Sequence, residues 1–244
     1  MNSKDIYNSV CEIITKSEKY ISNGTCFLYE NNSILYAISN KHIIYGDKGE
    51  KIKLSLKLNV KNKNTNQSYV VEKTIPILEN NIIKEEKYDI SAYPIECIKQ
   101  SIENDNYELD HYIIKSSDIM FDYDDLDYIE EIFCVGYPCG FKDSVTNRPI
   151  ITKGISATPI QANLENLDVF LGDITNYGGN SGSPVFIKIN NIYKLVGISY
   201  GMLHKPINVK NVVINSQKIE NIKGEIESLF NICVKSKILK NIFR

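Results

Sequence analysis

The chain has 244 residues, of which 43% are hydrophobic and 24% charged, and this suits one compact unit or two small lobes that share a cleft. Its formal net charge is −2 and its pI is about 6.0, so no global basic field attracts nucleic acid or an anionic membrane. The first residues lack the apolar core of a secretory signal, and no apolar run approaches the ~18 residues of a membrane helix. We therefore expect a cytoplasmic protein.

The cysteines give no sign of a metal or a disulfide framework. An even count allows disulfides, but a cytoplasmic location argues against them. Cys134 and Cys139 are separated by four residues, with no second cysteine pair and no histidine nearby, which is not the spacing of a zinc site. We expect no metal and no cofactor. The six cysteines are Cys11, Cys26, Cys97, Cys134, Cys139 and Cys233.

The first half of the chain begins with a helical pattern and continues as strands. Residues 3–21 place their isoleucines and Val10 near one face, with Asn2 or Ser3 as a cap, so we expect an N-terminal helix over residues 1–21. Residues 51–60 alternate between apolar and polar side chains, which is typical of a half-buried strand. With further strands at 25–29, 34–39, 69–78 and 88–95, residues 22–100 are predicted to form a small six-stranded barrel.

The second half repeats this organisation after an acidic stretch. Residues 101–130 are interpreted as a connector with its acidic face in solvent, because the run lacks the glycine and the terminal glutamate of a calcium loop. A second six-stranded barrel is predicted over residues 131–215. Residues 216–244 carry apolar side chains near one helical face, which predicts a C-terminal helix. The expected fold is therefore all-β, with two six-stranded antiparallel barrels and a flanking α-helix at each end.

A glycine-rich segment suggests a nucleophile. In the segment 178–184, Gly-Gly-Asn-Ser-Gly-Ser-Pro, Ser181 stands between small residues. Glycine adopts positive φ without steric cost, so such a turn can point two backbone N–H groups at the oxyanion that forms during acyl transfer, with the Ser181 hydroxyl as nucleophile beside them. Glycine, asparagine, serine and proline are also common in ordinary turns, so a plain loop remains the alternative.

A serine nucleophile needs a base and a group that orients it. Of the three histidines, His42 follows a predicted strand, His111 lies in the acidic connector and His204 follows the last large strand. Asp89 is a single acid entering an apolar strand, where an acid seldom lies without a partner. The order His42, Asp89, Ser181 is one of the three orders in which this triad occurs. It places the base and its orienter in the first barrel and the nucleophile in the second.

These residues resemble the trypsin-like serine peptidases of the chymotrypsin fold, and most closely the bacterial branch without secretion signals or disulfides. The resemblance covers roughly residues 22–220. Its motifs are Gly24-Thr25-Cys26-Phe27, Ser39-Asn40-Lys41-His42, Asp89-Ile90-Ser91 and Gly179-Asn180-Ser181-Gly182-Ser183-Pro184, with further likeness at 135–138, 148–155 and 196–201.

The resemblance implies a role for each matched residue. Ser181 would be the acylated nucleophile, His42 the general base and acid, and Asp89 the orienter. The N–H groups of Gly179 and Ser181 would form the oxyanion hole, and residues Ser199, Tyr200 and Gly201 would pair with a substrate bound as an extended strand. Thr175 matches the floor of the primary specificity pocket, and because it is uncharged we expect a small, polar or apolar substrate side chain there.

The resemblance also implies how the protein would be controlled. Asn180 stands where secreted relatives carry an aspartate that pairs with a newly made α-amino group, and an amide does not form that ion pair. Activity would be constitutive, or controlled by the flanking helices or a regulatory partner protein, and an assay after deletion of residues 1–21 tests this. The expected function is a cytoplasmic serine endopeptidase that performs limited proteolysis of a partner protein. The alternatives are a catalytically silent binding module on the same fold, and an esterase.

Overall fold

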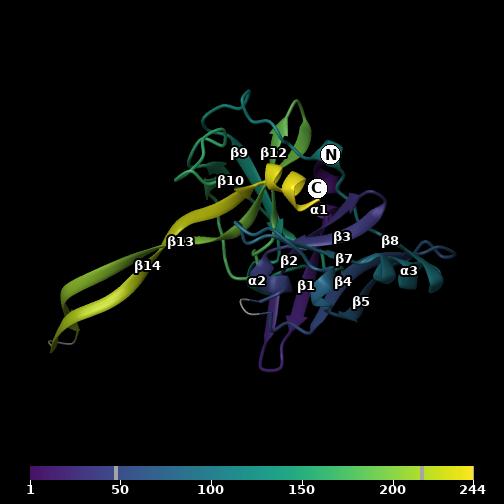
Figure 1. The fold of residues 1–244 in the computed structure, drawn as a ribbon, viewed down its shortest axis with the longest axis horizontal. Helices are drawn as coiled ribbons and strands as arrows, with labels where there is room; N and C mark the ends of the chain where they lie inside the picture. Colours follow the sequence, from purple (N-terminus) through teal and green to yellow (C-terminus); the bar gives the residue numbers. More distant parts are fainter. Residues whose placement is uncertain (47–48, 215–216, 244) are drawn as a thin grey trace.

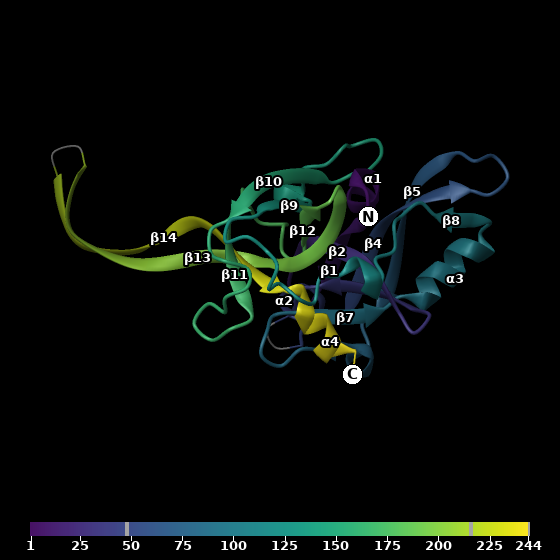
Figure 2. The same cartoon turned by 90° about the horizontal axis from the view of Figure 1, so that it is seen from above.

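The fold is described from a computed structural model that covers residues 1–46, 49–214 and 217–243, with the backbone alone described for residues 203–229. Strands dominate it, so the prediction of a mostly β protein is confirmed. They form two lobes that lie side by side, and a two-stranded arm extends away from the second lobe (Figures 1 and 2). Among the described residues no helix is long and apolar enough to cross a membrane.

The first lobe is an eight-stranded antiparallel sheet in the order β5-β4-β1-β2-β3-β7-β6, with β8 paired to β4. Short helices connect or flank these strands. The elements are α1 (Ser3–Asn8), β1 (Val10–Lys16), β2 (Ile21–Asn31), β3 (Ile34–Ser39), α2 (Lys41–Ile44), β4 (Lys53–Asn62), β5 (Ser68–Pro76), the 3₁₀ helix η1 (Glu79–Asn81), β6 (Ile83–Lys84), β7 (Ser91–Pro94), α3 (Glu96–Asn104) and β8 (Tyr107–Leu109).

This sheet does not close into the six-stranded barrel predicted for residues 22–100. Its edge strands, β5 and β6, are not paired with each other among the described residues. The edge strand β6 has only two residues, and the side chains of β5 are mostly exposed. Helix α3 helps to cover the core instead, because Ile98 and Ile102 pack in the same apolar cluster as Leu54, Leu56 and Leu58 of β4.

The N-terminal helix predicted over residues 1–21 is wrong beyond its first turns. The Asn2 side chain caps α1, as the sequence suggested, but the helix ends at Asn8 and the chain continues as β1. An apolar spacing that fits a helix also fits a strand over a short run. The strand forms here because β1 inserts between β2 and β4, where Cys11 and Ile13 are completely buried.

The second lobe is a closed six-stranded barrel in the order β10-β11-β14-β13-β12-β9. It confirms one of the two predicted barrels, although it needs residues beyond the predicted limit of 131–215. Its elements are β9 (Glu131–Gly136), the 3₁₀ helix η3 (Pro138–Gly140), β10 (Ile150–Ser156), β11 (Val169–Asp173), β12 (Pro184–Ile189), β13 (Ile192–Ile214) and β14 (Gln217–Lys235).

The C-terminal helix predicted over residues 216–244 is wrong for most of its length. Residues Gln217–Lys235 form β14, and only the short 3₁₀ helix η4 (Ser236–Ile238) and helix α4 (Leu239–Ile242) follow. Strand β14 pairs with both β11 and β13, so it closes the barrel. The outer parts of β13 and β14 pair along the arm as far as Ile214 and Gln217. His204 lies in β13, and its side chain is outside the described residues.

Residues 101–130 do more than connect the lobes. Besides the end of α3 and β8, they contain the 3₁₀ helix η2 (Ser116–Asp118). Asp122, Asp124, Asp125 and Asp127 are exposed, and the apolar side chains between them are buried. One apolar cluster draws residues from both lobes, including Phe27 and Ile38 of the first and Val135, Phe186 and Leu195 of the second. The two lobes therefore share a core.

Candidate active site

His42 and Asp89 lie together because strand β3 ends beside the point where its neighbour β7 begins. Ser39, the last residue of β3, pairs with Ser91, the first residue of β7. His42 lies in helix α2 just after β3, and Asp89 just before β7, so the strand pairing places the two segments side by side. The structure thus brings together two of the three residues singled out in the sequence.

Asp89 holds His42 through both its side chain and its backbone. The Nδ1–H group of His42 donates to Oδ2 of Asp89, and the backbone N–H of His42 donates to Oδ1 at 2.9 Å. The Asp89 carbonyl accepts from the Asn40 side chain at 2.7 Å and from the Lys41 N–H at 3.3 Å. The Asp89 side chain is 16% exposed and that of His42 is 36% exposed. The imidazole is therefore held at Nδ1. Its Nε2 has no hydrogen-bond partner among the described residues.

Ser181 lies in the loop between β11 and β12, and two glycines give this loop its shape. Gly179 has φ +96° and Gly182 has φ +85°. A Cβ added at Gly179 would lie 2.3 Å from the Tyr137 carbonyl oxygen, and one added at Gly182 would lie 2.2 Å from the Ser39 hydroxyl. Both positions thus require glycine for backbone conformation and for space.

The same loop leaves two N–H groups without an acceptor. The Asn180 N–H donates to the Tyr177 carbonyl at 3.0 Å, and the Ser183 N–H donates to the Asn180 carbonyl at 2.9 Å. The N–H groups of Gly179 and Ser181 donate to no acceptor within the part of the chain that the structure describes. A pair of free backbone donors beside a serine hydroxyl is the arrangement that an oxyanion requires.

Thr25 of β2 fastens this loop to the first lobe. Its hydroxyl donates to the Gly179 carbonyl at 2.8 Å and accepts from the Tyr137 N–H at 3.1 Å. Its backbone N–H donates to the Ser181 carbonyl at 3.0 Å, and its carbonyl accepts from the Ser39 hydroxyl at 2.7 Å. Thr25 of the first lobe therefore bonds to Gly179 and Ser181 in the serine loop. It also bonds to Ser39, at the end of the strand that precedes His42.

The serine loop and the segment that carries His42 are linked through Gly182 and Ser39. Between the described residues, no hydrogen bond joins the Ser181 hydroxyl to the imidazole of His42. Gly182, which follows Ser181, lies against Ser39, three residues before His42, so the serine loop packs on the segment that leads to the histidine. Catalytic hydrogen bonds are often formed only with substrate present, so this geometry is compatible with a serine and its base in the unliganded state.

The predicted specificity residues lie beside a carboxamide network that the sequence did not reveal. Thr175 is exposed. Next to it, the Asn176 side-chain amide donates to Oδ1 of Asn231 at 2.9 Å. Asn231 is completely buried on β14, and its Nδ2 lies 3.0 Å from the Ser199 hydroxyl. The Oδ1 atom of Asn176 is buried with no partner among the described residues. A buried asparagine in a strand was the available signal, but residue 231 was predicted to be helical.

Of the three residues predicted to pair with a substrate strand, Ser199 has its backbone groups bonded within the protein. The Ser199 N–H already donates to the Ser183 carbonyl at 2.8 Å, and the Ser199 carbonyl accepts from the Gly182 N–H at 3.0 Å. The pairing of β12 with β13 ends at Pro184 and Ile198. Tyr200 is exposed, and a Cβ at Gly201 would meet nothing within 4 Å. The open part of β13 therefore starts at Tyr200.

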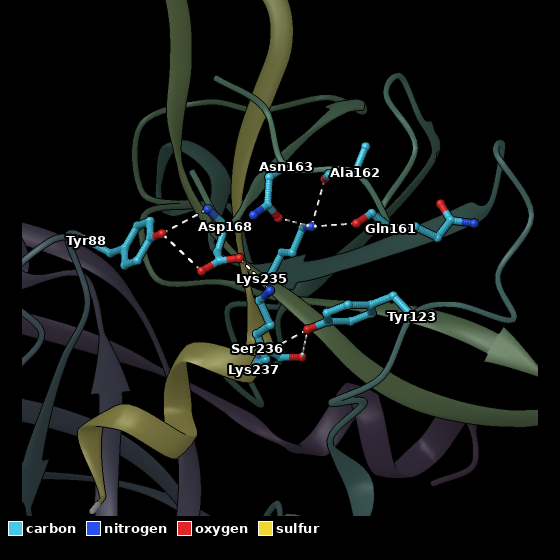
Figure 3. Close-up of polar contacts among 9 residues, drawn as sticks. All are labelled: Tyr88, Tyr123, Gln161, Ala162, Asn163, Asp168, Lys235, Ser236 and Lys237. Atoms are coloured by element: carbon cyan, nitrogen blue, oxygen red, sulfur yellow. Dashed lines mark hydrogen bonds and ion pairs between the residues drawn. The ribbon is translucent and has the colours of Figure 1, made fainter. Parts of the chain in front are cut away.

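A polar cluster joins the segment before Asp89 to the second lobe (Figure 3). The Tyr88 hydroxyl accepts from the Asp168 N–H at 2.9 Å, and Lys237 pairs with the Asp168 carboxylate at 2.5 Å. Partial burial raises the pKa of Asp168, but the hydrogen bond and charge of Lys237 outweigh it and hold that pKa below its usual value. Burial and the charge of Lys237 lower the pKa of Lys235, beside this pair, to about 8. Through Tyr88 and Asp168, the cluster links the two lobes close to Asp89.

His111 takes no part in this site. Its Nε2 accepts from the Asn59 N–H at 2.9 Å, and its Nδ1–H donates to the Asn8 carbonyl at 3.1 Å, so both ring nitrogens are used in the neutral form. Burial, together with the charge of Arg148, lowers the pKa of His111 to about 4. Within the residues that the structure describes, no cluster of three histidine, cysteine or acidic side chains is placed to hold a metal.

We expect His111 to make the fold sensitive to acid. The pKa is about 4 in the folded protein and about 6.5 in the unfolded chain, so the unfolded state binds more protons between these values. Stability is therefore retained above pH 6.5 and falls by about 2–3 kcal/mol as the pH drops to 4.5. Urea unfolding at the two pH values measures this, and His111→Gln should remove most of the difference. An unchanged difference in the variant would assign the effect to other groups.

Comparison with known proteins agrees with this architecture. No family profile and no curated protein matches the chain. Among solved structures, a thermostable serine protease from an extremophilic microorganism is 8% identical and aligns over 97% of this chain and 95% of that one, with a TM-score of 0.55. A variant of the HtrA-type protease AlgW, solved with a tripeptide, is 12% identical and aligns over 96% of this chain with a TM-score of 0.53.

A viral protease is similar to the same extent. The tobacco etch virus protease, solved with its product, is 10% identical, with 96% of this chain and 76% of that one aligned and a TM-score of 0.51. The chain spans 58% of the length of the HtrA-type protease. The protein therefore has the fold of the trypsin-like serine peptidases, with one closed barrel and one open sheet.

Proposed function

We propose that this chain is a serine endopeptidase that acts through Ser181, His42 and Asp89. The observation that carries the proposal is the hold of Asp89 on His42, at the imidazole and at the backbone. It is joined by a glycine-shaped serine loop in which the N–H groups of Gly179 and Ser181 have no acceptor among the described residues. A plain surface loop needs neither the free donors nor the fastening by Thr25. The solved structures with the same fold are proteases, which supports the same class of reaction.

Each residue has one task in the proposed reaction. Asp89 keeps the proton on Nδ1 of His42, so that Nε2 accepts the proton of the Ser181 hydroxyl as its oxygen attacks the peptide carbonyl. The oxyanion is bound by the N–H groups of Gly179 and Ser181. His42 then returns the proton to the leaving amine, an acyl-enzyme forms at Ser181, and water activated by His42 hydrolyses it.

The proposed substrate is a protein segment bound as an extended strand. The open edge of β13 at Tyr200 and Gly201 offers backbone groups for such pairing, and two of the similar structures hold a tripeptide or a product. The uncharged Thr175 and the buried amides of Asn176 and Asn231 favour a small or polar side chain next to the cleaved bond. A basic substrate side chain would find no carboxylate among these three residues.

The terminal segments are integral to the lobes and are not separate regulatory helices. Strand β1 lies between β2 and β4, and β14 closes the barrel. Deletion of residues 1–21 would therefore remove a central strand and test folding instead of regulation. Asn180 is 2% exposed and uncharged, which supports constitutive activity over activation by a new α-amino group. The six cysteines are free thiols in the structure. The proposed setting is the cytoplasm, where thiols stay reduced, and the proposed reaction there is limited proteolysis of a partner protein.

Fluorophosphonate labelling tests the proposal directly. We expect one adduct on the wild-type protein at Ser181, read by intact mass and peptide mapping, and none on Ser181→Ala. His42→Ala should react at least ~10³-fold more slowly, because the hydroxyl loses its base. A folded wild-type protein that takes no label would instead support the silent binding module. Comparison of peptide and ester substrates separates an endopeptidase from an esterase.

A further inference from the structure

Cys11 and Cys26 face each other across two neighbouring strands of the first lobe. They are direct partners in the antiparallel pairing of β1 with β2, and their Sγ atoms lie 3.2 Å apart. Both side chains are completely buried. This pair takes no part in the proposed catalysis, and the remaining four cysteines lie elsewhere. Cys134 and Cys233 are in the core of the barrel, and Cys97 and Cys139 are exposed.

The strand register gives this pair the Cα spacing that is expected for a disulfide. The Leu28 N–H donates to the Ser9 carbonyl at 3.1 Å, so hydrogen-bonded pairs recur at every second position and include Cys11 with Cys26. Such pairs have Cα atoms about 5.5 Å apart, which lies within the range of about 4.4–6.8 Å found in disulfides. The sulfurs need to move together by roughly 1 Å to reach bonding distance.

We propose that Cys11 and Cys26 are a site of reversible oxidation, at which hydrogen peroxide converts the two thiols into a cross-strand disulfide. One sulfur, as the thiolate, attacks a peroxide oxygen, the O–O bond breaks, and a sulfenic acid and one water form. The second sulfur then attacks the sulfenic sulfur, the S–S bond forms, the S–O bond breaks and a second water leaves. Two thiols are oxidised and one peroxide is reduced to two waters, so atoms and electrons balance.

Burial makes this pair slower to react than the exposed cysteines. Desolvation, reinforced by the hydrogen bond with Cys11, raises the pKa of Cys26 well above its usual value, and the thiolate is the reactive form. Cys97 and Cys139 therefore react with peroxide first, but neither has a sulfur partner in contact within the described part of the chain. Oxygen adducts are expected at the exposed cysteines, whereas loss of two hydrogens is expected at the buried pair.

The disulfide would brace the strand that supports the serine loop. Cys26 directly follows Thr25, whose hydroxyl and N–H hold the backbone of Gly179 and Ser181. The cross-link encloses a short loop of β1 and β2 and so limits the conformations of the unfolded chain. We expect it to raise Tm by roughly 5–10 °C.

The experiment uses the full chain carrying Cys97→Ser and Cys139→Ser, which removes the exposed thiols. After prolonged exposure to hydrogen peroxide we expect the intact mass to fall by about 2 Da, a linked peptide pair containing Cys11 and Cys26, and a raised Tm. Dithiothreitol should restore the original mass and Tm. The same protein with Cys26→Ser should show no loss of hydrogen.

Two results would overturn the proposal. One is that, after exposure to peroxide, the protein is still folded and keeps its free thiols, and its intact mass has not fallen. The other is a linked peptide pair that joins Cys134 to Cys233 in place of Cys11 to Cys26. Because the peptide map is made on a protein that retains both cysteines, it decides the matter even if Cys26→Ser does not fold. Neither outcome depends on whether Ser181 is catalytic.

Discussion

Replacement of Asp89 by Asn is expected to lower kcat/KM by about 10⁴-fold while leaving the fold intact. The amide retains an oxygen for the His42 N–H, and the Asp89 carbonyl keeps its bonds with Asn40 and Lys41. Its NH₂ group, however, donates to Nδ1 and forces the imidazole proton onto Nε2. The imidazole then has no free nitrogen to accept the proton of Ser181.

Two measurements separate this effect from misfolding. The rate of fluorophosphonate labelling and the rate of peptide cleavage should fall together, while Tm changes little. Asp124→Asn is the matched control, because it makes the same change of charge at an exposed position in residues 101–130 and should label at the wild-type rate. If Asp89→Asn labels within about tenfold of wild type, the proposed orienting role is wrong.

Replacement of Thr25 by Val should also reduce labelling strongly, although Thr25 lies outside the proposed triad. Valine has nearly the same shape but loses the bonds of the hydroxyl to the Gly179 carbonyl and the Tyr137 N–H. Two buried backbone groups lose their partner, which costs about 1–3 kcal/mol of unfolding free energy. Without this bond the Gly179 carbonyl is free to rotate and the Gly179 N–H loses its position as an oxyanion donor, so labelling should slow by about 10²-fold.

Thr25→Ser provides the control for this prediction. Serine keeps the hydroxyl and loses only the methyl group, so labelling should stay close to the wild-type rate. Denaturant unfolding of the three proteins gives the free energies, and labelling rates give the function. Equal labelling rates in the Val and Ser variants would mean that the loop keeps its conformation without the hydroxyl, through the Thr25 N–H and the bonds within the loop.

The sequence predicted the candidate catalytic residues better than it predicted the residues that hold them in place. His42 and Asp89 could be placed because each stands where a strand ends or begins, and the glycines around Ser181 indicated a shaped loop. In the sequence, Thr25 is only one residue of the motif Gly24-Thr25-Cys26-Phe27. Its role depends on contacts with Gly179 and Tyr137, which are far away in the chain. A local pattern carries no information about such partners.

The two terminal segments show why local patterns misassign secondary structure. Ile6, Val10 and Ile13 fit one face of a helix. Val10 and Ile13, however, lie in β1, which pairs with β2 on one side and with β4 on the other. Residues 217–235 likewise have a helical spacing but are needed between β11 and β13. Tertiary packing overrides weak helical preference when an open sheet edge is available. The first barrel was predicted from a count of strands, which does not show whether the edges meet.

The position of β14 has a consequence for how the protein is made. Synthesis proceeds from the N-terminus, and the first lobe, whose strands all precede residue 110, is complete early. The barrel stays open until residues 217–235 emerge from the ribosome, because β14 lies between β11 and β13. A nascent chain therefore already carries Ser181 but lacks the closed barrel that supports its loop. The proposed protease would therefore become active only after β14 has been translated and has closed the barrel around the Ser181 loop.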